Sequence, residues 1–285
     1  MLLPAHAVEL EGTITAIDAT AREVSIARIT ANGNKILKVE IAPNAGDLSD
    51  LKVGDAITAS YDPETEIVTT ITSESRPWLF YDFMCSGVTP KKGLTVVSDS
   101  EVRCLPVSSH NSGRFMLVTQ KQYDSGVFRC EFYYEDEKMD GNPFVGVAST
   151  LPTMKGSSVR DRFPRGIEVK LWHHGFGALV FWEESFKADM VYGQAREGRV
   201  VPPLKEQVPV RRGWNALEVE LNADNTILVK GNGVLLNAIT RAENTRGHIV
   251  LFPPWTDFRF RNASIEIAGR KQSLPFAGMH TVPCK

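Results

Sequence analysis

The sequence predicts an all-β protein in which a small N-terminal β-barrel precedes a larger two-sheet sandwich of the jelly-roll type. Short segments of alternating polar and apolar residues recur along the chain, and Gly, Asn, Asp or Pro punctuate the gaps between them. We find no long segment with the periodicity of an amphipathic helix. Aromatic residues are sparse in the first part of the chain and frequent afterwards, which indicates two domains of different character.

The composition is that of an ordinary globular protein. The chain has 285 residues, a formal net charge of −2 and 42% hydrophobic residues. This charge provides no basic surface, so we expect no nucleic acid as a partner. No apolar run approaches the roughly 18 residues that a transmembrane helix needs, so we expect no membrane span.

The first domain is predicted to span residues 8–72 as a small, five-stranded, OB-like β-barrel. The segment GTITAIDATAREVSIAR predicts two strands joined by a turn that contains Asp18, and KILKVEIAP predicts a third. The segments AITASYD and ETEIVTTITSE predict the last two strands. OB-like barrels often bind nucleic acid or sugar, but this one lacks surface aromatic residues for stacking on bases. We therefore expect a structural or docking role.

The second domain is predicted to span residues 73–285. Many antiparallel strands over this length are typical of a jelly-roll sandwich. The candidate strands are residues 114–119, 126–135, 143–149, 166–173, 177–183, 215–221, 226–230, 234–238, 248–252 and 257–267. Trp214 precedes one of these strands, and we expect its side chain to lie in the core. We expect His248 to be a structural hydrogen-bonding residue.

The segment RGIEVKLWHHGFGALVFW, residues 165–182, concentrates functional side chains. It predicts a strand, a glycine turn and a second strand. Because strand side chains alternate between faces, Ile167, Val169 and Leu171 share one face. The other face carries Glu168, Lys170, Trp172 and, by the same alternation, His174. This face is either a binding surface or an ordinary solvated one.

An ordered set of motifs in the second domain resembles the 3-keto-disaccharide hydrolase domain family, whose fold is a concanavalin A-like jelly roll. The motifs are GVFRCEFYYE, RGIEVKL, VYGQ, GWNALEVELNADNTILVKGNGVLL, RGHIVLF and FRFRNASIEI. The family typically has a Glu-x-Gln strand, and here Lys170 follows Glu168 where Gln is common. The resemblance implies carbohydrate as the ligand.

The resemblance also implies cleavage of 3-keto-glycosides in the groove of the jelly roll, by hydrolysis or by abstraction of the C2 proton and elimination. A neighbouring carbonyl acidifies the C2 proton, so one base suffices, with a cation or a divalent metal stabilising the enediolate. The candidate catalytic residues are Glu168, His173 and His174. The candidate substrate-binding residues are Lys170, Trp172, Tyr192, Trp255, Arg259 and Arg261.

The sequence leaves other functions open. No ExDxE pattern of the jelly-roll glucanases is present, and a standard glycosidase needs two carboxylates. The alternatives are a non-catalytic carbohydrate-binding module and a protein-interaction domain of the cell envelope. An enzyme requires acid and base groups that converge, whereas a binding module requires exposed aromatic faces.

The start of the chain and the cysteines bear on its location. The segment MLLPAHA is either the tail of a secretory signal peptide or a disordered start, and we expect a periplasmic or secreted protein. The four cysteines form no CxxC pair, which disfavours a zinc ribbon. We expect either disulfides, with Cys85–Cys104 and Cys130–Cys284 as possible pairs, or free buried thiols.

Overall fold

The fold is described from a computed structural model of the chain. It describes residues 8–30, 33–43, 45, 48, 51–73, 76–82, 85, 87–105, 115–135, 142–152, 162–173, 175–182, 188–190, 199–204, 210–254 and 256–282. The chain divides into two compact units, Met1–Pro77 and Trp78–Lys285, and each is considered by itself. Almost all regular structure in both units is β-strand, as the sequence predicts.

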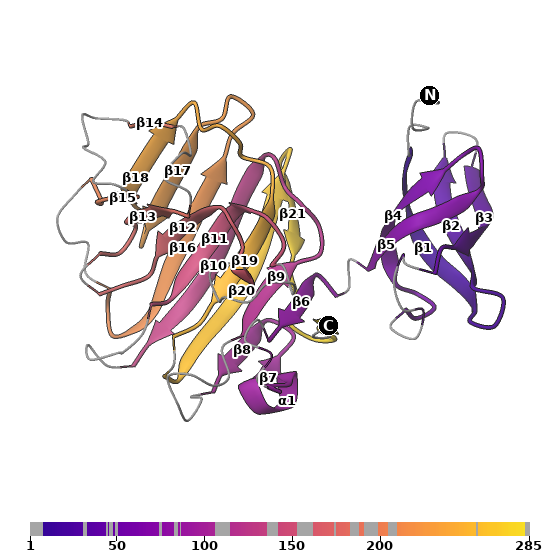
Figure 1. Ribbon diagram of the computed structural model, residues 1–285, viewed down its shortest axis with the longest axis horizontal. Helices are drawn as coiled ribbons and strands as arrows, with labels where there is room; N and C mark the ends of the chain where they lie inside the picture. Colours follow the sequence, from indigo (N-terminus) through magenta and orange to yellow (C-terminus); the bar gives the residue numbers. More distant parts are fainter. Residues whose placement is uncertain are drawn as a thin grey trace. The chain divides into compact units, whose positions relative to one another are not determined.

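The first unit is a closed five-stranded barrel (Figure 1). Its strands are β1 (Val8–Asp18), β2 (Glu23–Thr30), β3 (Gly33–Ile41), β4 (Ala56–Asp62) and β5 (Ile67–Ser73). They follow the order β1-β2-β3-β5-β4, and β4 closes the barrel by pairing with β1. The β3–β5 contact is parallel, whereas the other pairings are antiparallel. The predicted OB-like barrel is therefore confirmed.

The alternation of the barrel strands accounts for its core. Leu10 and Ile14 on β1 and Val24 and Ile26 on β2 point inward and are almost completely buried. The turn between these strands depends on Asp18, whose carboxylate accepts hydrogen bonds from the backbone of the next residues, at 3.0 and 2.9 Å. Such an Asp turn orders the chain reversal, as the sequence predicts.

The second unit is a sandwich of two sheets. The described part of the first sheet has nine strands: β14 (Asp189–Met190), β18 (Val234–Thr240), β17 (Ile227–Gly231), β16 (Gly213–Leu221), β10 (Gly126–Tyr134), β20 (Phe258–Ile267), β8 (Glu101–Cys104) and β7 (Leu94–Ser98), with β21 (Arg270–Ser273) also paired to β20. We call it the nine-stranded sheet. The short helix α1 (Pro90–Gly93) precedes β7.

The second sheet, called here the eight-stranded sheet, completes the sandwich. Its described strands are β15 (Val200–Val201), β13 (Leu179–Phe181), β12 (Ile167–Lys170), β11 (Phe144–Ser149), β19 (His248–Phe252), β9 (Met116–Thr119), β6 (Trp78–Tyr81) and β22 (His280–Val282). The ribbons of the two sheets overlie one another in Figure 1. This arrangement confirms the predicted concanavalin-like jelly-roll sandwich.

The main hydrophobic core lies between the two sheets. On β10, Phe128 and Phe132 point into this core, and on β20, Phe258 and Phe260 meet them from the neighbouring strand. Phe132 stacks on Phe258 with ring centroids 6.0 Å apart. The outward positions of these strands carry charged residues, so each strand has one apolar and one polar face.

The two expected disulfide pairs are not formed. Cys104 and Cys130 are free thiols buried in the main core, and burial raises the pKa of both well above the usual range. Both proposed disulfide pairs are therefore wrong, because each includes one of these two residues. Cys85 does take part in a disulfide.

Several short strands were not predicted from the sequence. β6, β7, β8, β21 and β22 are short, and β22 pairs in parallel with β6 although about two hundred residues separate them. Trp78 begins β6, donates from its ring nitrogen to the Leu274 carbonyl oxygen at 3.1 Å, and stacks on Phe276. β6 and β22 therefore depend on contacts between residues distant in the sequence, which local patterns do not reveal.

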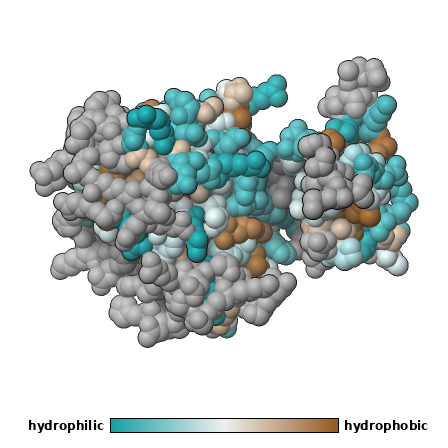
Figure 2. All heavy atoms as spheres, turned by 45° about the horizontal axis from the view of Figure 1, so that its top comes forward, coloured by the Kyte–Doolittle hydropathy of each residue, from teal (hydrophilic) through white to brown (hydrophobic). Residues whose placement is uncertain are grey.

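Among the coloured residues on the face drawn in Figure 2, hydrophilic ones predominate, with smaller hydrophobic patches on each unit. Within the described residues, no helix is long and apolar enough to cross a membrane.

Candidate functional site

Strand β12 carries two ionisable residues on the face that points away from the main core. Ile167 and Val169 point into the main core, as the alternation predicts. Glu168 and Lys170 point to the opposite face, but only 6% and 2% of their surfaces are exposed. The predicted alternation is therefore correct, whereas the option of an ordinary solvated face is wrong.

Glu168 and Lys170 form a close ion pair. The Lys170 ammonium group donates to the Glu168 carboxylate and, at 2.9 Å, to the amide oxygen of Asn142. An ammonium group has three protons to donate, so these partners leave one for another acceptor. The two residues are two positions apart on one strand, which brings both side chains to the same point on the sheet face.

Aromatic rings surround the ammonium group. It lies 5.0 Å from the centroid of the Phe144 ring and 5.2 Å from that of Trp172. Phe144 stacks on Phe252 of the adjacent strand β19, with centroids 4.8 Å apart. Of these rings, Trp172 is the exposed one, with 37% of its surface open. The pair therefore lies in an aromatic environment whose exposed edge is an indole.

Arg199 contributes a further positive charge that the sequence did not single out. Its guanidinium group lies 5.7 Å from the centroid of the Trp182 ring and donates to the Trp182 carbonyl oxygen at 3.2 Å. Its charge lowers the pKa of Glu168 and also that of Lys170. No local pattern indicates this role, because Arg199 comes from a separate segment just before β15.

Burial dominates the electrostatics of the pair. It raises the pKa of the Glu168 carboxyl group, although Lys170 and Arg199 act in the opposite direction. It also lowers the pKa of the Lys170 amine, although Glu168 opposes this shift. Both shifts favour the neutral forms, because a low-dielectric environment disfavours charge. Perturbed pKa values of this kind are frequent at sites of general acid–base chemistry.

His173 lies apart from this pair. The centroid of its ring lies 6.2 Å from that of Tyr134, a buried residue of the main core, and the two ring planes are inclined by 30°. Among the contacts that the structure describes, none joins the His173 side chain to Glu168. His174, Tyr192 and Trp255, which the sequence also singled out, lie outside the described residues.

Arg259 and Arg261 lie on the other sheet, on its outward face. Their neighbours Phe258 and Phe260 point into the main core, so apolar and charged side chains alternate along this part of β20. Arg261 donates to Glu131 at 2.6 and 2.8 Å. The main core separates these two candidate substrate-binding residues from Glu168, so they cannot bind a substrate together with that residue.

The expectation that the Trp214 side chain lies in the core is wrong. Its side chain is partly exposed on the outward face of the nine-stranded sheet instead of lying in the core. The Arg261 guanidinium group lies 3.9 Å from the centroid of its ring, and Tyr133 meets the ring edge-on at 5.2 Å. The indole thus supports a cation–π contact on a polar face.

His248 has the structural role that the sequence predicts. Its Nδ1 atom lies 2.7 Å from the Thr119 carbonyl oxygen, and its Nε2 atom lies 3.2 Å from the amide nitrogen of Gln122. Nδ1 therefore donates and Nε2 accepts, which is the pattern of a neutral ring. Burial lowers the pKa of His248 accordingly.

No group of three or more His, Cys, Asp or Glu side chains in the described residues is arranged to hold a metal ion.

Comparison with known proteins identifies the family. The profile of the 3-keto-alpha-glucoside-1,2-lyase-like domain matches residues 73–266, and the chain belongs to this family. This confirms the resemblance found in the sequence and supports a carbohydrate-processing role. A comparison with curated proteins finds no match.

Solved structures of similar fold share little sequence with this chain. Porphyranase B from Zobellia galactanivorans is 9% identical, with a TM-score of 0.40 over 65% of this chain and 83% of that one. The Bacillus licheniformis beta-glucanase is 13% identical, with a TM-score of 0.39 over 66% and 90%. A carbohydrate-binding module from Bacillus subtilis is 12% identical, with a TM-score of 0.35 over 60% and 93%.

Proposed function

We propose that this protein cleaves 3-keto-glycosides by removing the C2 proton and eliminating the substituent at C1, on the face of the eight-stranded sheet that carries Glu168 and Lys170. The observation that carries the proposal is the buried ion pair of these two residues in a chain of the 3-keto-alpha-glucoside-1,2-lyase-like family. A buried pair of this kind is expensive in desolvation, so a chemical role accounts for it better than stability does.

The reaction needs one base and one source of positive charge. The base takes the C2 proton, and the electron pair of that bond moves onto the C3 carbonyl oxygen as an enediolate. This electron pair then forms the C1–C2 double bond as the C1–O bond breaks, and the departing oxygen takes up a proton. The products are an unsaturated 3-keto sugar and the free alcohol, so no oxidant or reductant is consumed.

The described residues can fill these roles. Glu168 is the base, because its raised pKa makes its carboxylate a stronger proton acceptor than an ordinary one. Lys170 and Arg199 supply the positive charge that favours the enediolate, and the remaining ammonium proton can go to the departing oxygen. The exposed Trp172 ring offers a flat surface for the C–H face of a sugar.

Elimination is proposed in preference to displacement by water. Displacement by the usual glycosidase route uses two carboxylates that flank the scissile bond. The carboxylate that the described contacts place beside Lys170 is Glu168, and a 3-keto sugar requires only one base. A divalent metal could assist the enediolate, and treatment with EDTA tests that part of the proposal.

A non-catalytic carbohydrate-binding module is the second candidate function. The low exposure of Glu168 and Lys170 favours it, because a base must reach its substrate, whereas the exposed Trp172 ring can bind sugar by itself. A module of this kind would bind saccharides without converting any of them.

We also propose that the protein is periplasmic or secreted. The disulfide at Cys85 supports this, because disulfides persist in oxidising compartments. Cell fractionation followed by thiol counting in denaturant tests it. An exported, oxidised protein shows the Cys104 and Cys130 thiols without reductant and additional thiols only after reduction.

The test of the enzymatic proposal is product analysis on 3-keto-disaccharides and their unoxidised parents, with and without EDTA. The wild type should release sugar from the keto forms alone, and Glu168→Gln should release none. Glu40→Gln, an exposed glutamate on the barrel, is the matched control and should behave as the wild type. Saccharide binding without any turnover by the wild type would instead establish the binding module.

A further inference from the structure

A cavity lies on the outward face of the nine-stranded sheet, on the opposite side of the main core from Glu168. Its volume is about 530 Å³, within the range of small-molecule sites. Strands β10, β16, β17 and β20 contribute most of its lining. The residues used in the argument are Arg129, Glu131, Glu218, Lys230, Asn262 and Ser264. We call this cavity the outer groove.

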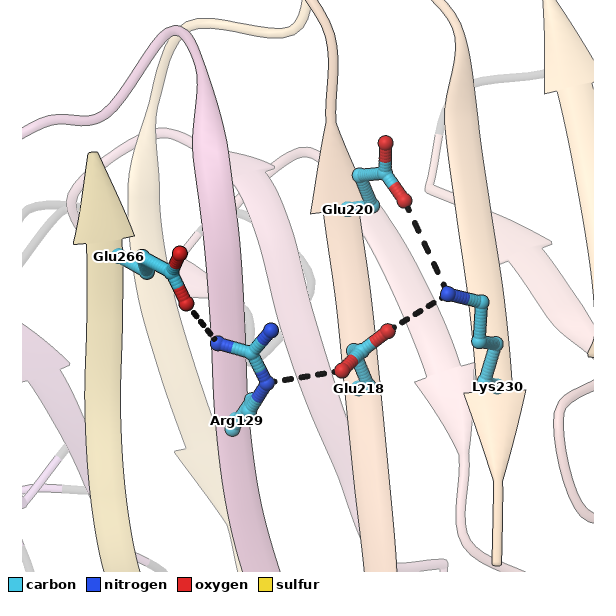
Figure 3. Close-up of polar contacts among 5 residues, drawn as sticks. All are labelled: Arg129, Glu218, Glu220, Lys230 and Glu266. Atoms are coloured by element: carbon cyan, nitrogen blue, oxygen red, sulfur yellow. Dashed lines mark hydrogen bonds and ion pairs between the residues drawn. The ribbon is translucent and has the colours of Figure 1, made fainter. Parts of the chain in front are cut away.

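A ladder of ion pairs crosses the floor of the outer groove (Figure 3). Arg129 on β10 donates to Glu218 on β16 at 2.8 Å and to Glu266 on β20 at 2.7 Å. Lys230 on β17 donates to the other oxygen of Glu218 at 2.8 Å and lies 3.9 Å from Glu220. Lys230 and Arg129 hold the pKa of Glu218 below its usual range. The charged groups of Arg129, Glu218 and Lys230 are therefore held in position by one another in the absence of a ligand.

A second set of polar groups lies at another part of the groove. Glu131 accepts a hydrogen bond from Asn262 at 2.8 Å through one oxygen and from Arg261 through the other. The β10–β20 register shifts between Arg129 and Glu131, and Asn262 adopts a positive φ of 54° opposite this irregularity. Bulges of this kind redirect side chains and are frequent beside functional sites.

Ser264 provides an independent indication of a ligand. It lines the groove, is only 3% exposed, and pairs in register with Arg129. Its hydroxyl oxygen is buried and makes no hydrogen bond among the described residues. Buried polar groups in native proteins are almost always hydrogen-bonded, so an orphan hydroxyl in a cavity indicates a missing partner.

The charges of the groove select the kind of ligand. The cations Arg129, Lys230 and Lys271 and the carboxylates Glu131 and Glu218 line it. All of these except Lys271 have ion-pair partners within the sheet that the structure describes. A ligand with a net charge would bring a like charge against some of these groups. A neutral polyhydroxylated ligand can accept from the cations and donate to the carboxylates at the same time.

We infer that the outer groove is a second carbohydrate-binding site, which takes a neutral saccharide of about one or two rings. The hydroxyl groups of the sugar bridge the ion-pair ladder, and one of them supplies the hydrogen-bond partner of Ser264. This site is separate from the proposed catalytic face and does not depend on the reaction proposed there.

The test is an NMR titration of the full-length protein with maltose, cellobiose and sucrose, with glucuronate and glucosamine as charged comparisons. The amide signals of Ala216 and Ser264, both in the groove lining, report on the site. The neutral disaccharides should shift these signals, and the charged sugars should shift them less. Glu218→Gln and Ser264→Ala should each weaken this binding about fivefold or more, as expected for a lost hydrogen bond.

Two control variants keep the test specific. Ser25→Ala on the barrel is the matched serine control, and Glu168→Gln changes a residue on the opposite side of the main core from the groove. Both should leave the groove signals and their affinities unchanged, and thermal unfolding of every variant, Glu168→Gln included, verifies that it is folded. The inference is overturned if no neutral saccharide shifts the groove signals, if charged sugars bind better, or if Ser264→Ala and Glu218→Gln bind as the wild type does.

Discussion

Glu168 and Lys170 form an ion pair two positions apart on β12, and both side chains are buried on the face of the sheet away from the main core. Lys170 is further held by the amide oxygen of Asn142. Burial costs both charges their hydration, and a pair of well-packed apolar residues is often at least as stable. The stability of the fold therefore does not explain the pair, which is why we propose a role for it in proton transfer.

Removing one member of the pair should destabilise the protein strongly. Lys170→Met leaves the Glu168 carboxylate buried without its partner, and we expect a loss of about 3 kcal/mol in the free energy of unfolding at pH 8. The double variant Glu168→Gln/Lys170→Met should recover much of this loss, because no unpaired charge remains. Urea denaturation measures both values, and a double variant less stable than Lys170→Met would contradict this account of the pair.

The pH dependence of kcat/KM should report on Glu168. The base must be ionised, and burial raises the pKa of this carboxyl group, so the acidic limb should lie above the pH typical of an exposed glutamate. Arg199→Gln should move the limb to still higher pH, because the arginine charge now holds that pKa down. If Arg199→Gln leaves the acidic limb of the kcat/KM profile unchanged, the limb reports the titration of a group other than Glu168.

His248 should make the protein less stable in mild acid. The folded-state pKa of His248 lies below its ordinary value of about 6.5, so the neutral ring stabilises the fold above that pH. This contribution is lost as the pH falls from about 6.5 through the folded-state pKa, because the unfolded chain then binds the proton more tightly. Urea denaturation at pH 7.5 and 5.5 should show a larger decrease for the wild type than for His248→Asn.

Trp172 should affect substrate affinity more than fold stability. Its ring is partly exposed beside Lys170, so Trp172→Ala removes a stacking surface for sugar while disturbing little of the core. We expect KM to rise roughly tenfold, which corresponds to about 1.4 kcal/mol, with a smaller change in kcat. Steady-state kinetics on a 3-keto-disaccharide measures both constants. An unchanged KM would show that Trp172 does not contribute to substrate binding.

Local alternation predicted much of the fold. The pattern of β12 correctly separates core residues from outward residues, because a strand's two faces are fixed by its period of two. The ordered motifs of the second domain identified the family, and short strands with tight turns identified the barrel.

Properties that depend on distant contacts were not predictable in this way. Alternation places Arg259 and Glu168 outward from the core, but it cannot say that they lie on different sheets. The burial of Glu168 depends on residues from other strands, and the role of Arg199 depends on a segment with no pattern of its own. For the same reason, the orphan hydroxyl of Ser264 is visible only once β10 and β20 are paired.

The most direct test of the central claim is the fate of a deuterium label at C2 of the keto ring of a 3-keto-disaccharide. Mass spectrometry of the unsaturated 3-keto sugar follows the label, and an enzyme-free sample corrects for spontaneous exchange. If Glu168 removes the C2 proton, the wild type forms an unsaturated 3-keto sugar that has lost the label, and Glu168→Gln forms no product. Product that retains the deuterium, or undiminished release by Glu168→Gln, would contradict the proposal.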